Sequence, residues 1–259
     1  PGQHISIYTN NDDGWETAKD LKEAGCNVIC IIDQRPDINP PIKNIDYVLG
    51  RKIAKAYGNL RISSIKLDNG KIIKTDCLAV SGGFNPNLHL TCHQRGRPKW
   101  DELNHCFIPN NPPKNMSVIG AANGIFNYQD IFKDSKIKLT KILQNLGHKK
   151  VSIEEVKISN RVYKVLPFPK NIPEGKVWVD LQNDVTVKDI KLAVHEGFHS
   201  VELLKRYTTL GMATDQGKNS NVLGLSILSV IKNKPMDEVG TTIFRPPFTP
   251  VPIGAFAGR

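Results

Sequence analysis

Long apolar runs are missing from the 259-residue sequence, and so is any recognisable leader. No stretch approaches the roughly 18 consecutive apolar residues that cross a bilayer. The chain begins with Pro1 rather than Met, and the segment that follows has no signal-peptide pattern. We therefore expect no membrane insertion, and we interpret the chain as a segment of a longer protein.

Cysteine is also scarce. The thiols form an odd set without the spacing of a disulfide framework, at Cys26, Cys30, Cys77, Cys92 and Cys106. Several lie in apolar stretches such as "CNVICII", so we predict reduced core residues and a cytoplasmic protein. Zinc-type side chains gather in "HLTCH" and in the "HC" that follows, but their spacing matches no closed zinc site, and we expect no metal.

Acidic residues are fewer than basic ones, which leaves a net charge of +10. Such a balance raises the question of nucleic acid, yet the lysines are spread along the chain and no nucleic-acid motif is present. We expect solvated lysines and no nucleic-acid partner. The alternative is a basic face that attracts a partner subunit or an anionic ligand.

Catalytic sets are absent as well. The seven histidines have no carboxylate partners at informative spacing, and neither a Ser-His-Asp nor a Cys-His arrangement can be recognised. The segment therefore shows no complete active site of its own, and we assign no catalytic residue to it.

What the sequence does contain, near its start, is an α/β pattern. Residues 5–33 read as strand, helix and strand ("ISIYT", "GWETAKDLKEAG", "NVICIID"), a βαβ unit that predicts a parallel sheet. The pair Asn69 and Gly70 predicts a hairpin turn, because both residues tolerate positive φ. Further buried strands are expected in "CLAVSGG" and at Ser117 to Ile119.

The rest of the sequence predicts helices after a weakly patterned connection. From about Asp134 to Lys176 it shows one short amphipathic helix and proline-punctuated segments, which we interpret as a linker. Thr186 and Ser200 are good N-caps for two helices, and "NVLGLSILSVIKNK" carries the apolar stripe of a third. The proline-rich end is expected to be extended.

The first turn stands where an α/β unit grips a dinucleotide, yet it reads T-N-N-D-D-G instead of G-x-G-x-x-G. Only Gly14 is in place, and side chains at Thr9 and Asn11 would crowd a pyrophosphate. The two carboxylates that follow would repel it. Two interpretations remain: a structural turn, or a dinucleotide in an altered pose with Asp33 near its ribose.

Two later turns are rich in small residues. "VIGAANG", residues 118–124, places Gly120, Ala121 and Ala122 at a helix start, where backbone N–H groups could receive a pyrophosphate. Tight packing alone would explain the same residues. "GMATDQGKNSN", residues 211–221, is either an anion-binding turn with Lys218 or a helix-linking loop with a solvated lysine.

Several stretches together resemble the α subunit of heterotetrameric sarcosine oxidase. They are "GQHISIYTNND", "DCLAVSGGFNPNLHL", "RPKWDE", "VIGAANG", "VDLQNDVTVKDIKLAVHEGFHSVELLKRYTTLGMATDQGKNSN" and "GTTIFRPPFTPVPIGAFAGR". The resemblance covers nearly the whole chain and is weakest in the linker. It implies a central fragment of that subunit, with two nested Rossmann-like domains of the disulfide-reductase type followed by a small helical domain.

The resemblance also implies where the domains lie. Residues 1–78 would form the inserted Rossmann-like domain, 79–134 the returning part of the outer NAD-binding domain, 135–176 a linker, 177–240 the helical domain, and 241–259 the start of a folate-binding, aminomethyltransferase-like domain. The inserted domain would leave its turn empty. A noncovalent NAD would bind at Gly120, Ala121 and Ala122, with Phe126 and Tyr128 close by, and would need the part of the subunit before Pro1.

The helical domain resembles the [2Fe–2S] domain of bacterioferritin-associated ferredoxin, whose cysteines follow the pattern C-x-C and then C-x4-C. Asp180, Gln182, Asp215 and Ser220 stand at the four cysteine positions. Because such clusters require thiolates, we expect no iron–sulfur cluster. The resemblance instead implies an FMN at the boundary with the β subunit, its phosphate reached by Arg206, Thr208, Thr209 and Lys218.

For the intact enzyme the resemblance implies oxidation of sarcosine to glycine. Electrons would pass from FAD on the β subunit to FMN and then to O2, giving H2O2, and tetrahydrofolate would take the one-carbon unit as 5,10-methylenetetrahydrofolate. The partners would be the β, γ and δ subunits, and this segment would contribute NAD binding, FMN contact and subunit assembly. The alternatives are the α subunit of a related opine or D-amino-acid dehydrogenase and a non-catalytic assembly module.

Overall fold

The computed structural model describes residues 2–93, 96–148, 165–166, 172, 175–242 and 251–258. They divide into two compact units. The first unit consists of the described part of residues 1–84, joined by Leu166, whose backbone N–H donates to the carbonyl oxygen of Asn10 at 3.3 Å. The other described residues, from 85 onward, make up the second unit. No described helix is long and apolar enough to cross a membrane.

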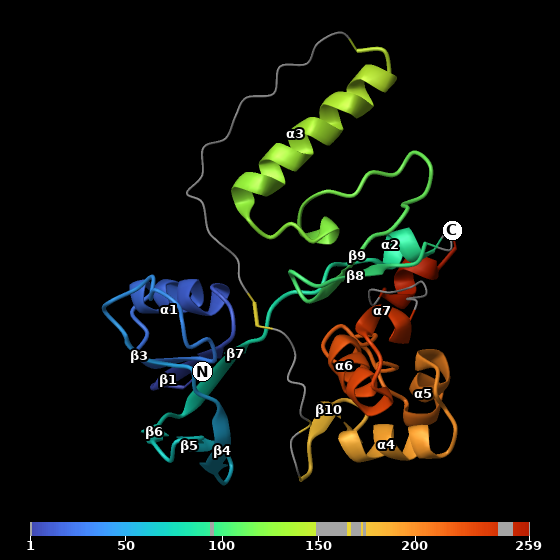
Figure 1. The fold of residues 1–259 in the computed structure, drawn as a ribbon. Coiled ribbons are helices and arrows are strands. Elements are labelled where there is room, and N and C mark those ends of the chain that lie inside the picture. Colours follow the sequence, from blue (N-terminus) through green and yellow to red (C-terminus); the bar gives the residue numbers. More distant parts are fainter. Residues whose placement is uncertain are drawn as a thin grey trace. The chain divides into compact units, whose positions relative to one another are not determined.

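The first unit contains a parallel sheet with the strand order β3-β2-β1-β7 and an antiparallel sheet with the order β4-β5-β6 (Figure 1). Its elements are β1 (Ile5–Thr9), α1 (Asp13–Glu23), β2 (Val28–Asp33), β3 (Asp46–Leu49), β4 (Ile53–Gly58), β5 (Ile62–Leu67), β6 (Ile72–Lys74) and β7 (Cys77–Ser81). Because β1 pairs with β2 in parallel, the predicted βαβ unit is confirmed. The predicted hairpin joins β5 to β6, and Gly70 adopts a φ of +88° there.

Both faces of the parallel sheet are covered. One face carries α1, and Trp15 and Ala18 of that helix are completely buried against Ile7 and Ile31. On the other face Cys30 and Ile32 of β2 pack against Ile65, Leu67 and Ile73 of the antiparallel sheet. Alternate residues of β2 therefore enter different cores, as the two-residue repeat of a strand requires.

The second unit combines short strands with helices. Its elements are α2 (His89–Cys92), β8 (Lys99–Asp101), β9 (Cys106–Ile108), η1 (Gly120–Asn123), α3 (Tyr128–Asn145), β10 (Trp178–Asp180), β11 (Val185–Thr186), α4 (Val187–His195), α5 (Val201–Thr208), α6 (Asn221–Lys232), α7 (Met236–Val239) and η2 (Ile253–Phe256). One hydrophobic core joins Leu88 and Phe107, from its first segment, to Ile190, Leu204 and Leu225 of the later helices. The segment around α2 and β9 and the helices α4 to α6 are thus packed as one body.

The expectation of a buried strand at Ser117 to Ile119 is wrong. The backbone at Ile119 is extended, with φ −129° and ψ 161°, but no described strand pairs with it, and the side chain is 41% exposed. A strand needs a neighbouring ladder to satisfy its N–H and C=O groups, and apolar sequence alone does not supply one. Extended conformation is therefore all that these residues have in common with the predicted strand.

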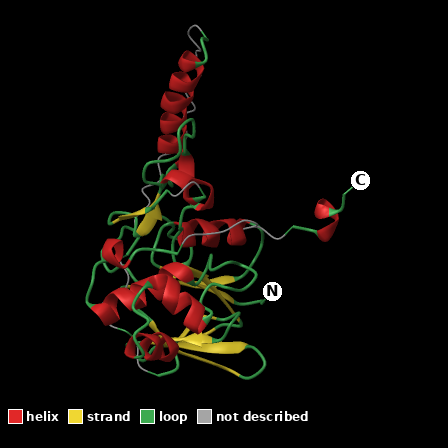
Figure 2. Ribbon diagram, turned by 90° about the vertical axis from the view of Figure 1, so that its right-hand side faces the viewer, coloured by secondary structure: helices red, strands yellow, loops and turns green. Residues whose placement is uncertain are grey.

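Helix α3 is longer than the short helix that the linker pattern predicts. It has 18 residues, none of them buried, and both views show it extending away from the helices α4 to α6 of its own unit (Figures 1 and 2). Most of its exposed apolar residues, together with Leu146 just past its end, are three, four or seven positions apart, as in the seam of a helix that packs against a partner. They are Tyr128, Phe132, Leu139, Ile142 and Leu146; Ile137, which is 50% exposed, lies outside this seam. Residues 149–164 of the expected linker lie outside the described part of the chain.

Helices α4 and α5 begin where the sequence predicts, and each cap is visible. Ser200 Oγ accepts a hydrogen bond from the backbone N–H of Leu203 at 3.2 Å. At α4 the Asp189 carboxylate accepts from both the backbone N–H and the hydroxyl of Thr186, each at 2.7 Å. These hydrogen bonds from Thr186 lower the pKa of Asp189, because they stabilise its charged form.

Replacing Asp189 by alanine will reduce stability by about 1 kcal/mol at pH 7, the typical worth of a helix cap. Because folding lowers the pKa of this carboxyl, its contribution is present at neutral pH and is lost as the pH falls below about 4. Urea titrations of the Asp189→Ala variant should therefore converge with those of the wild type in acid. Lys191→Ala, on the same helix, is the control, and a difference that does not shrink as the pH falls from 5 to 2 would contradict the capping role.

Candidate functional site

The turn between β1 and α1 is filled by its own side chains. Asn11 is completely buried, and its Oδ1 accepts from the backbone N–H of Asp13 at 3.0 Å and from the hydroxyl of Ser81 at 3.2 Å. Its Nδ2 donates to the carbonyl oxygen of Ser81 at 3.1 Å. Thr9 lies so close to Gly14 that a Cβ there would overlap it, so the glycine serves helix–strand packing. The space that a pyrophosphate would use is taken by these contacts.

Asp33, which stands where a dinucleotide-binding unit places its ribose carboxylate, is completely buried and already engaged. Its Oδ2 accepts from Trp15 Nε1 at 2.7 Å and from Arg35 Nη2 at 2.7 Å, and its Oδ1 accepts from the backbone N–H of Arg35 at 2.9 Å. Arg35 also reaches Asp12, with Nη1 and Oδ1 2.9 Å apart. The ion pairs and the indole close this end of the sheet and support the interpretation of a structural turn.

Arg35 was not singled out by the sequence, although it is central to this closure. Burial disfavours its charge, but hydrogen bonds and Coulomb attraction from Asp33 and Asp12 outweigh that effect and raise its pKa above the usual value. Its signals were the spacing D-x-R at the end of β2 and a tryptophan in the first turn of α1. Neither pattern by itself says that the arginine folds back onto the carboxylate.

The second candidate turn is a single 3-10 turn, η1, followed by a separate helix. Gly120 is buried with a φ of +63°, a backbone conformation that favours glycine, and Ala121 is exposed. Helix α3 has its own cap, because Asn127 Oδ1 accepts from the backbone N–H of Gln129 at 3.1 Å. Of the two aromatic residues that follow the turn in the sequence, Phe126 is half-buried and Tyr128 is 53% exposed.

The residues implied for a flavin phosphate lie at the end of α5 and in the loop that follows. Arg206 and Thr209 are exposed, and Thr209 ends the helix with a φ of +61°. The hydroxyl of Thr208 donates to the carbonyl oxygen of Leu204 at 2.8 Å and accepts from the backbone N–H of Leu210 at 3.3 Å, and the hydroxyl of Thr209 donates to the carbonyl oxygen of Thr208 at 2.6 Å. Lys218 is exposed. Its charge is felt by His89 of α2, whose pKa is lowered first by burial and then by the charges of His93 and Lys218.

The four positions that match cluster cysteines form hydrogen bonds at the end of β10 and in the loop between α5 and α6. Asp180 is 3% exposed; its Oδ2 accepts from the backbone N–H of Gly211 at 2.8 Å and from Ser220 Oγ at 3.3 Å, and its Oδ1 accepts from the N–H of Gln182 at 3.0 Å. Asp215 accepts from the N–H of Gly217 at 3.0 Å. Among the described residues no three His, Cys, Asp or Glu side chains gather as metal ligands.

Fold and turns together define an α/β protein with a Rossmann-like parallel sheet, a closed nucleotide-type turn and a helical domain. Residues 174–259 match the family model of the sarcosine oxidase A3 domain. Over its full length the chain is 37% identical to sarcosine oxidase subunit alpha of Rhizobium meliloti (strain 1021) and 28% identical to that of Corynebacterium sp. (strain P-1). The chain is therefore a homologue of the sarcosine oxidase alpha subunit, as its motifs predict.

The chain spans 27% and 29% of the length of these two relatives. Among solved structures, L-proline dehydrogenase from P. horikoshii shares the fold, with a TM-score of 0.73 and 18% identity. That match covers 100% of this chain and 50% of the other. The α/β class and the C-terminal helical domain are thereby confirmed, whereas the nested domain boundaries stay a prediction.

Proposed function

We propose that this chain is the central part of the α subunit of a heterotetrameric sarcosine oxidase, which works with β, γ and δ subunits. The reaction is the conversion of sarcosine, O2 and tetrahydrofolate into glycine, H2O2 and 5,10-methylenetetrahydrofolate. The observation that carries the proposal is the 37% identity to a sarcosine oxidase subunit alpha along the entire chain. Bound FAD and FMN would supply the electron transfer to oxygen.

Within that enzyme the role of this segment would be to hold nucleotides rather than to react. NAD would bind at Gly120, Ala121 and Ala122, with Phe126 and Tyr128 beside it. Two features support this choice of turn. Gly120 has no Cβ and a φ of +63°, and the N–H groups at the start of η1 have no partner within that turn. The other candidate, between β1 and α1, is filled by Asn11 and by the ion pairs around Asp33.

Two unpartnered features support an outer domain that is completed by more of a longer subunit. Ile119 is extended without a ladder, and α3 has an exposed apolar seam and no buried residue. In an α/β fold, an extended segment of this kind pairs with neighbouring strands in a sheet, and the helix that follows it packs its apolar side against that sheet. An intact subunit of the relatives' length would contain enough chain to supply that sheet, and the inserted domain would then be the first unit described above.

FMN would be held at the β-subunit boundary by Arg206, Thr208, Thr209 and Lys218. An exposed guanidinium and an exposed lysine are groups that fit a phosphate. The hydroxyls of Thr208 and Thr209 donate to backbone carbonyl oxygens and would have to rotate to donate to it. The C-terminal dipole of α5 is unfavourable to an anion, so the cationic side chains would provide the attraction. Folate would bind to a domain that begins at about residue 241, and no iron–sulfur cluster is expected in the helical domain.

Nucleotide release tests the proposal directly. The intact α subunit containing this segment and the 259-residue chain are each denatured, and the supernatants are analysed for NAD by chromatography and mass spectrometry. We expect NAD in the intact subunit and little in the shorter chain. Ala121→Glu should reduce the NAD content to roughly a tenth, because a carboxylate at η1 repels a phosphate. Gln144→Glu, which makes the same change of charge at an exposed position near the other end of α3, is the control.

Other outcomes have definite meanings. Stoichiometric NAD in the 259-residue chain would show that the turn between β1 and α1 binds after all. The absence of both NAD and flavin from the assembled subunits would leave the non-catalytic assembly module. If the subunit holds FMN but no NAD, only the assignment of an NAD site to Gly120, Ala121 and Ala122 is contradicted, and the proposed flavin contact is unaffected.

A further inference from the structure

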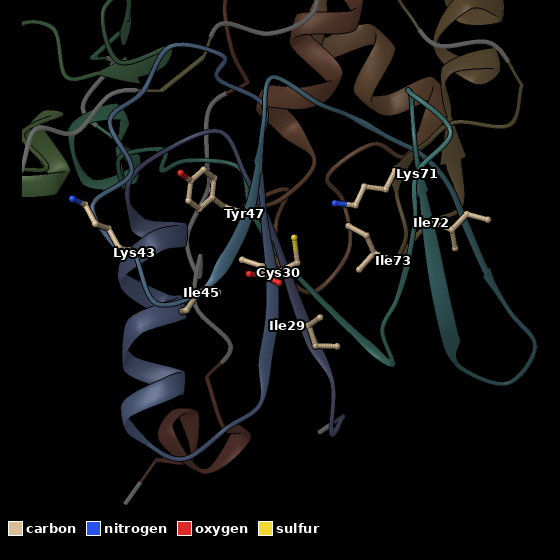
Figure 3. Close-up of a pocket in the computed structure, with 9 residues that line it drawn as sticks. Ile29, Cys30, Lys43, Ile45, Tyr47, Lys71, Ile72 and Ile73 are labelled. Carbon is tan, nitrogen blue, oxygen red and sulfur yellow. The ribbon is translucent and has the colours of Figure 1, made fainter.

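The cavity of the first unit selects no class of ligand. It has a volume of about 460 Å³ and is lined mainly by residues of β2, β3 and β6. Figure 3 shows the ammonium group of Lys43 and the side chain of Ile72 directed away from it. The charges that remain, on Lys71 and Asp46, are equal and opposite, so neither an anion nor a cation is favoured. The loop at residues 211–221 of the second unit is more specifically built.

This loop is closed by the side chain of Asn221, the first residue of α6. Asn221 is 4% exposed, and its amide lies against both Gly211 and Gly217. A Cβ at either glycine would overlap the amide, and the two glycines have φ values of +68° and +76°. The backbone N–H of Asn221 also donates to the carbonyl oxygen of Gly217 at 2.9 Å. The two glycines therefore meet on one buried side chain.

The same amide holds the segment that follows α7. Asn221 Nδ2 donates to Thr242 Oγ1 at 3.2 Å, and Thr242 is 4% exposed. Because both groups are buried, breaking this bond would leave an amide hydrogen without a partner, and that cost fixes the two segments relative to each other. Thr242 stands near the beginning of residues 241–259, the expected start of the folate-binding domain.

The backbone at Lys218 is set by the same contacts. Lys218 directly follows Gly217, is exposed, and precedes Asn221 by three positions. Its backbone N–H donates to the carbonyl oxygen of Asp215 at 3.3 Å, and the Asp215 carboxylate accepts from the backbone N–H of Gly217 at 3.0 Å. The direction in which the loop presents this lysine therefore depends on how Asn221 holds Gly217.

We propose that Asn221 is a positioning residue, which sets the loop that presents Lys218 to a phosphate group and couples that loop to the start of the next domain at Thr242. The inference rests on the flavin contact proposed above. Asn221 itself does not touch the phosphate, because its amide is enclosed by the two glycines and Thr242. A displacement at Thr242 reaches Lys218 through one side chain, so the folate-binding domain and the phosphate contact do not move independently.

Hydrogen–deuterium exchange of the intact α subunit, measured before flavin is bound, tests the coupling. Thr242→Val removes the hydroxyl and should accelerate exchange at Gly217 and Asn221 by about three- to tenfold, the effect of one buried hydrogen bond on a local opening equilibrium. Thr242→Ser keeps the hydroxyl and should exchange like the wild type. The matched control is Ser226→Ala, which removes another buried hydroxyl, bonded at 2.7 Å to the carbonyl oxygen of Leu223, and should leave the loop unchanged.

The FMN content of the assembled enzyme tests the positioning role. We expect Thr242→Val to retain about a third of the wild-type FMN or less, and both Thr242→Ser and Ser226→Ala to retain all of it. Lys218→Ala should lower the FMN content as well. Adding Thr242→Val to Lys218→Ala should cause no further loss, because the coupling acts through that lysine.

The outcomes separate this inference from the proposed function. If loop exchange is the same in Thr242→Val, Thr242→Ser and the wild type, the coupling is wrong whatever the FMN content. If Thr242→Val accelerates exchange but Lys218→Ala keeps its FMN, the flavin contact is wrong and the positioning role with it, whereas the tie between the loop and Thr242 stands. An equal FMN loss in Ser226→Ala, or additive losses in the double variant, would also overturn the positioning role.

Discussion

Replacing Asp33 by alanine will destabilise the first unit by about 3–5 kcal/mol, the cost of leaving one member of a buried ion pair without its partner. Arg35, only 5% exposed, would lose its main counter-charge, and Trp15 Nε1 would lose its acceptor. The measurement is hydrogen–deuterium exchange of the β1 and β2 segments, together with urea unfolding. Asp37→Ala, an exposed aspartate in the following loop, should change stability by less than about 0.5 kcal/mol.

A double variant distinguishes the charge from the packing. Asp33→Asn combined with Arg35→Met removes both charges and leaves an amide oxygen for the Trp15 indole. We expect it to recover at least half of the loss, because replacing a whole buried pair is often close to neutral. If Asp33→Ala costs less than about 1 kcal/mol, or the double variant is no better than the single one, the closed turn is not held by this ion pair.

Replacing Asp180 by alanine will destabilise the second unit by about 2–4 kcal/mol and loosen the loop at residues 211–221. Three donors lose a buried acceptor at once: the N–H groups of Gly211 and Gln182 and the hydroxyl of Ser220. Each buried donor left unpaired costs roughly 1–3 kcal/mol, less whatever water can restore. Asp180→Asn keeps one oxygen and should fall between alanine and the wild type.

Hydrogen–deuterium exchange locates the effect. Asp180→Ala should accelerate exchange in residues 211–221, and the control Asp237→Ala, an exposed aspartate of α7, should not. Since Lys218 lies in this loop, the same variant should also reduce FMN content in an assembled enzyme if the proposed flavin contact is correct. Unchanged exchange in the loop would mean that Gly211 and Gly217, which both pack on Asn221, hold it without the carboxylate.

The turn between β1 and α1 and the loop at residues 211–221 share one arrangement. In each, a position that related folds use for a ligand carries a buried carboxylate whose lone pairs are taken by nearby donors. At Asp33 the donors are an indole and a guanidinium, and at Asp180 they are backbone N–H groups and a hydroxyl. Neither carboxylate is available to a ligand without breaking contacts that hold its unit together.

The sequence by itself determined the features that depend on short-range patterns. The βαβ unit, the turn at Gly70 and the caps at Thr186 and Ser200 follow from periodicity and from residues a few positions apart. The family-specific stretches quoted above were also sufficient to predict the homology to sarcosine oxidase alpha subunits. The sequence alone also shows that the turn between β1 and α1 has only one of the three glycines of a dinucleotide-binding turn.

Only the tertiary structure decided how these pieces are completed. Asn11 is fixed by Ser81, 70 positions away, Asp180 by Gly211, 31 positions away, and Leu88 and Phe107 share a core with the helices α4 to α6. Tertiary structure also decided that Ser117 to Ile119 stay extended without a sheet. Local patterns limit the conformation of a segment, but which donors, acceptors and apolar faces meet depends on chain closure over long distances, and no spacing rule encodes that.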